Sequence, residues 1–159
     1  MIWFRPAAFF YDTLAFLSCA RAGRLLNGVQ LAATYLLSRL TGRYFFSGRP
    51  MALNAETFAG CNLHCPECPA GTGDRTGGAM PLALYQKALD ELDRSLCYTA
   101  FHFLGEPLLH PSIWKMVRSA TARGIYTELH TNGQRLMDFS PGEVIGSGLN
   151  RLRLSVDGA

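Results

Sequence analysis

Three cysteines stand close together in one short stretch of the chain, Cys61, Cys65 and Cys68, with the spacing C-x3-C-x2-C. Three thiolates can hold three irons of a cube-shaped 4Fe-4S cluster and leave the fourth iron open, whereas ordinary electron-transfer clusters are held by four cysteines. The open iron can take a ligand that is not protein. The pattern therefore predicts an iron–sulfur cluster that binds a substrate.

A structural zinc site in a binding module is the main alternative use of these thiols. Zinc takes four ligands, commonly two C-x2-C pairs or a mixed set of cysteine and histidine. The fourth would have to come from His102 or His110, because His64 lies inside the cysteine loop itself. Without zinc, we expect His102 to be structural, and His110 is a candidate to line the site. A disulfide framework is disfavoured, since the chain has five cysteines and three share one loop.

The composition fits one globular domain and argues against nucleic acid as a partner. The chain has 159 residues, of which 48% are hydrophobic, and its net charge of +3 is too small to attract a polyanion. The charge is uneven, however. Residues 1–50 carry six arginines against a single acid, Asp12. The basic excess therefore belongs to the N-terminal third.

Two helices are expected in that third, at residues 7–20 and 24–40. The second has apolar residues at helical spacing: Leu25, Leu26, Val29, Ala32, Ala33, Leu36, Leu37 and Leu40. The favoured interpretation is that this stripe packs on the domain that follows. The alternative is a basic amphipathic segment, residues 1–40, that contacts a membrane surface or a partner.

The first helical stretch resembles neither a membrane span nor a signal peptide. Asp12 interrupts residues 7–20, which are too short and too polar to cross a bilayer, and no small-residue cleavage site of the usual kind follows. An oxygen-sensitive cluster also requires a reducing compartment. We therefore expect a cytoplasmic protein.

From residue 51 onward the pattern alternates between strands and helices. Strands are expected at residues 52–58, 99–104, 125–130 and 151–156, and helices at residues 81–96, 112–123 and 143–147. Such alternation predicts a parallel sheet with helices outside it. Chemistry in barrels of this kind lies at the carboxyl ends of the strands, which is where the cysteine loop and three polar motifs fall.

The run of residues 60–69 resembles the cluster loop of the radical S-adenosylmethionine (radical SAM) enzymes, with Cys61, Cys65 and Cys68 as the iron ligands. The resemblance implies that S-adenosylmethionine binds the open iron. The reduced cluster then cleaves it to a 5′-deoxyadenosyl radical, which abstracts a hydrogen atom from the substrate. It also implies an electron donor such as flavodoxin or ferredoxin.

The later motifs are similar to the cofactor-binding strand ends of the same family. Gly105 and Glu106 match the family's GGEP motif, which meets the amino group of the cofactor. Asn132 matches the end of the third strand. Ser155 and Asp157 match the fourth-strand position that contacts the ribose hydroxyls and the carboxylate.

The chain departs from the family at two positions. Glu67 stands where the wider family has an aromatic residue that packs on the adenine, and Leu104 replaces the first glycine of GGEP.

The resemblance covers residues 52–158 and is closest to the branch whose members often carry a C-terminal SPASM extension, for which a peptide or protein substrate is the leading class. The family core is a partial TIM-like (β/α) barrel of six βα units. We expect about four of them here, in a core at residues 51–159 that ends early, preceded by an N-terminal helical segment at residues 1–50. An inactive fragment that binds the cluster is a further alternative.

Overall fold

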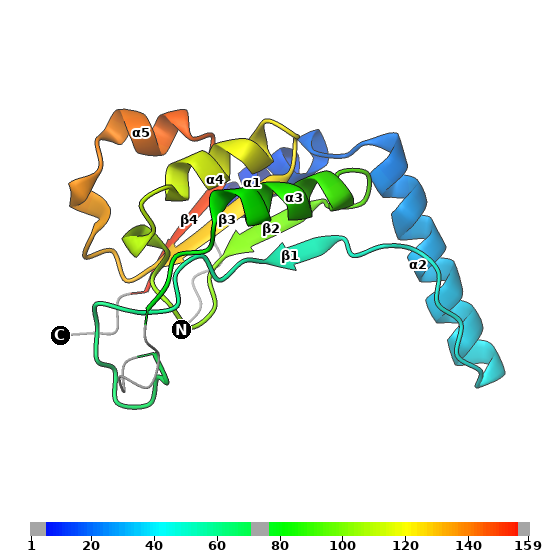
Figure 1. The fold of residues 1–159 in the computed structure, drawn as a ribbon. Helices are drawn as coiled ribbons and strands as arrows, with labels where there is room; N and C mark the ends of the chain where they lie inside the picture. The colour runs from blue at the N-terminus through cyan, green and yellow to red at the C-terminus, as the bar shows by residue number, and fades with distance from the viewer. Residues whose placement is uncertain (1–5, 71–76, 156–159) are drawn as a thin grey trace.

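The computed structural model describes residues 6–70 and 77–155, which form an α/β fold around one parallel sheet (Figure 1). The sheet has the order β1-β2-β3-β4, so each strand pairs with the next one in the chain. The strands are β1 (Ala52–Asn54), β2 (Tyr98–Phe101), β3 (Tyr126–Thr131) and β4 (Arg151–Leu154). The predicted fold class, with four parallel strands of a TIM-like barrel, is confirmed.

Each connection between neighbouring strands contains a helix. They are α3 (Leu82–Leu92), α4 (Ile113–Thr121) and α5 (Pro141–Gly146), with short 3-10 turns at η1 (Pro107–Leu109) and η2 (Leu136–Asp138). Strand β1 is shorter than predicted. Beyond Ala55, whose N–H still donates to the carbonyl of Ala100 (2.8 Å), the chain turns away to enter the cysteine loop.

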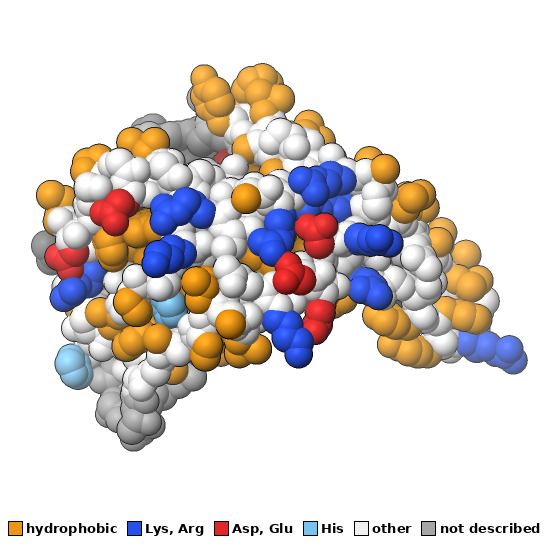
Figure 2. Space-filling view, turned by 45° about the horizontal axis from the view of Figure 1, so that its top comes forward, with side chains coloured by type: hydrophobic (Ala, Val, Ile, Leu, Met, Phe, Trp, Pro, Cys, Tyr) orange, Lys and Arg blue, Asp and Glu red, His pale blue; other side chains and the backbone are white. Residues whose placement is uncertain are grey.

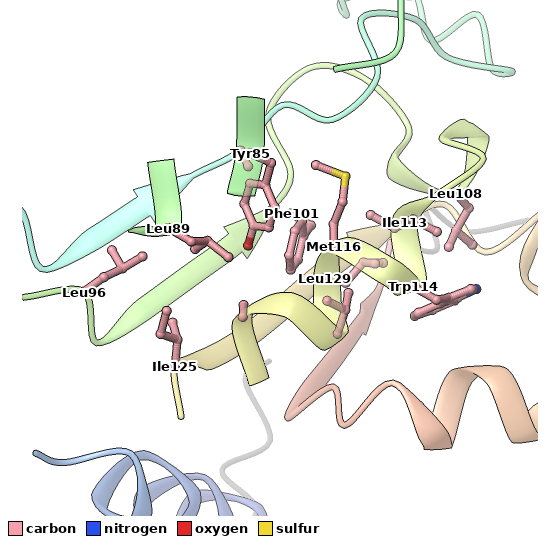
Figure 3. Close-up of a cluster of buried hydrophobic side chains, with 13 residues drawn as sticks. Tyr85, Leu89, Leu96, Phe101, Leu108, Ile113, Trp114, Met116, Ile125 and Leu129 are labelled. Carbon is pink, nitrogen blue, oxygen red and sulfur yellow. The ribbon is translucent and has the colours of Figure 1, made fainter. Parts of the chain in front are cut away.

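The hydrophobic core lies between the sheet and these helices (Figure 3). Helix α3 contributes Tyr85 and Leu89, and Tyr85 packs on Phe101 of β2 with ring centroids 5.6 Å apart. Helix α4 buries five of its nine residues: Ile113, Trp114, Met116, Val117 and Ala120. This packing fixes the strands, and therefore the loops that follow them.

The opposite face of the sheet is polar at its centre and is partly covered by α1 (Pro6–Ser18). Because side chains alternate along a strand, Tyr126 and Glu128 point to this face. Tyr126 donates to Asp12 of α1 (2.9 Å) and its ring lies 6.0 Å from that of Phe16. Asp12 also pairs with Arg151 of β4. Helix α1 is therefore tied to the amino-terminal ends of the strands, away from the cysteine loop.

Helix α2 (Ala22–Thr41) has the reverse of the predicted orientation. Its buried residues are Arg24, only 1% exposed, and Asn27, whereas the leucine stripe faces solvent. The interpretation that the stripe packs on the following domain is wrong. None of the helices in residues 6–70 and 77–155 meets the length and hydropathy needed to cross a membrane.

The cause of this orientation is the set of carbonyls that Arg24 reaches. Its guanidinium donates to the backbone oxygens of Cys19 (2.8 Å), Arg123 (2.9 Å) and Gly124, and burial lowers the pKa of Arg24. Asn27 adds a pair of bonds with the backbone of Arg49 (3.0 and 2.8 Å). Hydrogen bonds to a charged group are stronger than neutral ones, so the polar side of α2 is held against the domain.

Candidate functional site

A cavity of about 260 Å³ lies at the carboxyl ends of the strands. Most of the residues predicted to bind the cluster or the cofactor line it: Cys61, Cys65, Cys68, Gly105, Glu106, Asn132 and Ser155. The remaining one, Asp157, lies outside the described residues. Parallel strands end at a common edge of the sheet, and that geometry brings together residues that are up to 94 positions apart in the sequence.

The cysteine loop presents its three thiols to this cavity. Cys61 and Cys68 are half-buried and Cys65 is exposed, and all three are free. The Cys61 sulfur accepts hydrogen bonds from the N–H of Leu63 (3.4 Å) and the side-chain amide of Asn132 (3.8 Å). Within the described part of the chain, no three His, Cys, Asp or Glu side chains form a group that could hold a metal ion as placed. As a donor set, soft thiolates on one loop suit an iron–sulfur cluster.

His110 is not available as the fourth ligand of a zinc site. Its side chain is buried outside the cavity, with Nε2 2.8 Å from the carbonyl of Met80 and Nδ1 accepting from the N–H of Ser112 (3.0 Å). The alternative of a zinc-binding module therefore loses one of its two candidate histidines. His110 also does not line the site, for which it was a candidate.

Gly105 brings the backbone of the loop after β2 against the cysteine loop. A Cβ atom at this position would lie 1.7 Å from the carbonyl oxygen of Phe58. The next residue, Glu106, donates its N–H to the carbonyl of Gly60 (2.8 Å). The close backbone approach at this motif is therefore made by Gly105, while Leu104 stands where the family has the first glycine.

The carboxylate of Glu106 connects the loop after β2 to the end of β3 beside the cavity. It is 3% exposed. Its Oε1 accepts from the N–H of Leu108 (2.9 Å) and the hydroxyl of Thr131 (2.6 Å), and its Oε2 accepts from the N–H of Asn132 (2.9 Å). A carboxylate oxygen can accept two hydrogen bonds. Oε2 therefore keeps a second acceptor position, which a cofactor ammonium group can use.

Asn132 links the end of β3 to the cysteine loop. Its side-chain amide donates to the side-chain oxygen of Asn62 (3.0 Å), which follows the first cysteine, and its own oxygen accepts from the N–H of Gln134 (3.0 Å). Ser155 continues the pairing of β4 by donating its N–H to the carbonyl of Thr131 (2.9 Å). The strand ends are therefore held in register around the cavity.

Of the histidines at the cavity, His130 was missed as a functional candidate, and His102 was considered only as a zinc ligand or a structural residue. His102 and His130 both line it, and their rings stack with centroids 4.3 Å apart. Burial and the neighbouring His130 lower the pKa of His102. His130 in turn contacts buried Glu128 (2.5 Å). The strand register could have revealed this pair. Tyr98 pairs with Tyr126, and His102 and His130 each lie four residues later, so they lie side by side on the same face of the sheet.

Comparison with known proteins gives consistent matches. The profile of the Radical SAM superfamily matches residues 55–159. The chain is 31% identical over 110 residues to the mycofactocin maturase MftC of Mycobacterium ulcerans, covering 69% of this chain and 30% of that protein. It is 32% identical over 121 residues to the PqqA peptide cyclase of Ruegeria pomeroyi, covering 69% and 29%.

A solved structure of BtrN in complex with AdoMet and 2-DOIA matches with a TM-score of 0.56 and 26% identity. The match covers 72% of this chain and 49% of BtrN. The chain thus spans less than a third of the length of the two curated relatives and about half of this structural neighbour.

Proposed function

The chain belongs to the radical SAM superfamily, and on that premise we propose that Cys61, Cys65 and Cys68 hold a 4Fe-4S cluster beside a binding site for S-adenosylmethionine. The observation that carries the proposal is that all three thiols line one cavity together with strand-end residues such as Glu106 and Asn132. When bound, the two cofactors supply the one-electron cleavage and hydrogen abstraction of this superfamily.

The residues of this chain would then have separate tasks. The three thiolates leave one iron without a protein ligand. Glu106 has a free acceptor position on Oε2 for the amino group of S-adenosylmethionine. Ser155, exposed at the rim after β4, is placed for a ribose hydroxyl, and Asp157 follows it in the sequence. In this proposal residues 51–159 form the radical SAM core and residues 1–50 form a separate N-terminal segment.

A peptide or protein is the substrate class that we propose. The support is the similarity to a PqqA peptide cyclase and the resemblance of the cysteine loop to the SPASM-associated branch. The electron would come from a small donor protein such as flavodoxin or ferredoxin. Because the chain covers less than a third of these relatives, we assign its substrate only by class.

The test is anaerobic reconstitution with iron and sulfide, followed by EPR of the reduced protein with and without S-adenosylmethionine. We expect a 4Fe-4S signal that changes when the cofactor is added. The variants Cys61→Ala, Cys65→Ala and Cys68→Ala should each lose the signal and the production of deoxyadenosine. Cys97→Ala is the matched control, because this half-buried free cysteine does not line the cavity.

Two outcomes would contradict the proposal. One is an unchanged cluster signal in any of the three cavity variants, which would remove that cysteine from the ligand set. The other is a colourless protein that takes up one zinc ion and no iron, which would favour a zinc-binding module instead.

A further inference from the structure

Helix α2 exposes a continuous apolar surface that the domain leaves uncovered. We call it the α2 stripe and define it as Leu25, Leu26, Val29, Leu36, Leu37 and Leu40, all of them exposed. The exposed rings of Tyr44, Phe45 and Phe46 follow directly after the helix. Figure 1 shows α2 extending away from the sheet and its helices. The α2 stripe therefore lies on a projecting part of the molecule.

The polar side of α2 already makes hydrogen bonds to the domain and to the segment that follows the helix. Arg24 and Asn27 are fixed by backbone groups, and the hydroxyl of Ser38 donates to the carbonyl of Phe45 (3.1 Å). The helix therefore cannot turn its leucines inward without breaking the hydrogen bonds of a buried guanidinium. A binding partner must therefore bind the α2 stripe in its exposed position.

The charge around the α2 stripe has one sign. Residues 13–50 contain no aspartate or glutamate. Arg39 and Arg43 are exposed at the far end of the helix, next to the three aromatic rings, and neither has an ion pair among residues 6–70 and 77–155. Figure 2 shows this pattern: hydrophobic and basic side chains along the projecting helix, and acidic ones confined to the body.

A cavity extends the apolar surface at the junction of α1 and α2. It has a volume of about 300 Å³, and its lining includes Phe16, Leu17, Leu25, Met51 and Cys97. Leu25 belongs both to this cavity and to the α2 stripe, and Leu17 is also exposed. The apolar surface is thus continuous from the end of α1 to the end of α2.

We propose that the α2 stripe, with Arg39 and Arg43, lies on an anionic lipid surface. An amphipathic helix with arginines beside its apolar face binds in the plane of a membrane, with the leucines among the acyl chains and the arginines at the phosphates. Aromatic rings favour the same interface. A second copy of the chain fits less well, because two such surfaces would bring together unpaired arginines with no acid to compensate them.

The experiment is flotation of the full chain with two kinds of vesicle, one of phosphatidylcholine alone and one with about a third of phosphatidylserine. We expect binding to the anionic vesicles and much weaker binding to the neutral ones. Because each arginine near an anionic surface adds about fivefold to the affinity, the double variant Arg39→Glu/Arg43→Glu should bind at least 25-fold more weakly. The control is Lys115→Glu/Arg118→Glu, the same change of charge at exposed positions of α4.

A second pair of variants tests the apolar part of the surface. Leu40→Asp should weaken vesicle binding by tenfold or more, whereas Ile145→Asp on α5 should leave it unchanged. The two side chains are 76% and 78% exposed, so neither change disturbs the core. The circular dichroism spectrum of every variant should match that of the unchanged chain.

Three results would overturn the proposal. Equal binding to neutral and anionic vesicles would remove the role of the arginines. Equal loss in the α2 and the control variants would remove the role of this surface. Absence of vesicle binding would do the same, and concentration-dependent self-association that Leu40→Asp abolishes would then identify a second copy as the occupant. Since none of these variants touches the cysteine cavity, failure here leaves the proposed function untouched.

Discussion

Replacement of Glu106 by glutamine should destabilise the chain by about 2–4 kcal/mol even when no cofactor is bound. The buried carboxylate accepts three hydrogen bonds, from Leu108, Thr131 and Asn132. Hydrogen bonds to a charged group contribute about 1.5–3 kcal/mol each, against about 0.5–1.5 for neutral ones. Glutamine keeps one oxygen, which is best placed at Oε1, where it retains two of the three bonds in weakened form.

The third bond is lost outright in this variant. The side-chain NH₂ would face the N–H of Asn132, so this part-buried donor is left without an acceptor, at about 1–3 kcal/mol. The weakening of the other two bonds adds about 1–3 kcal/mol. Removal of the buried charge offsets part of this destabilisation, because glutamine is less costly to desolvate than a carboxylate. The net loss of about 2–4 kcal/mol follows.

Urea unfolding of the metal-free chain, followed by far-UV circular dichroism, measures the effect apart from catalysis. Glu91→Gln is the control, since Glu91 is exposed and the ion pair of its carboxylate within residues 6–70 and 77–155 is a long one with Lys87 (3.9 Å). This variant should cost less than about 0.5 kcal/mol. Thr131→Val removes the hydroxyl that donates to Glu106 and accepts from the N–H of Gly133 (3.0 Å), and it should cost about 2–4 kcal/mol. If Glu106→Gln is no more destabilising than the control, the carboxylate does not hold the strand ends together.

Two further predictions concern residues around the same cavity. Gly105→Ala should destabilise the chain by more than about 3 kcal/mol, because its Cβ would overlap the backbone oxygen of Phe58 and one of two packed loops must move; Gly78→Ala, with open space around it, is the control, and equal urea midpoints would refute the overlap. For His102 we expect an NMR titration midpoint below 6.5, because burial and nearby His130 disfavour its charged form. The unfolded chain then binds the proton more readily, so the free energy of unfolding should fall as the pH drops below about 6.5, and His102→Gln should reduce that dependence.

The sequence was sufficient to predict the order of the elements and the place of the site. All four strands and the helices between them were predicted, because apolar periodicity reports which elements bury one face. Gly105, Asn132 and Ser155 meet at one cavity for a simple reason: each follows a parallel strand of the same sheet. Local turns and the short length of β1 were less accessible, since they depend on contacts between loops.

The bonding inside the site was not predictable in the same way. The family resemblance predicted that Glu106 meets a cofactor, but it gave no sign of the partners that the structure shows. These are the N–H of Leu108 in the same loop and, at the end of β3, the hydroxyl of Thr131 and the N–H of Asn132. Every residue type except proline has a backbone N–H, so the sequence does not tell which N–H groups will surround a carboxylate. Only the fold determines this. The stacking of His102 on His130 was easier to predict, because it depends only on the register of two neighbouring strands.

The orientation of α2 shows where periodicity stops being informative. A stripe of leucines identifies one face of a helix, but not whether the domain lies on that side. Here Arg24 determines which side of α2 faces the domain, because its guanidinium donates to the carbonyls of residues 19, 123 and 124. At about 100° per residue, Val29 and Leu40 lie roughly 140–160° around the helix axis from Arg24. Once the guanidinium is buried, the leucines must therefore point away from the domain. The hydrogen bonds of Arg24 stabilise this orientation, and contacts of the leucines themselves do not.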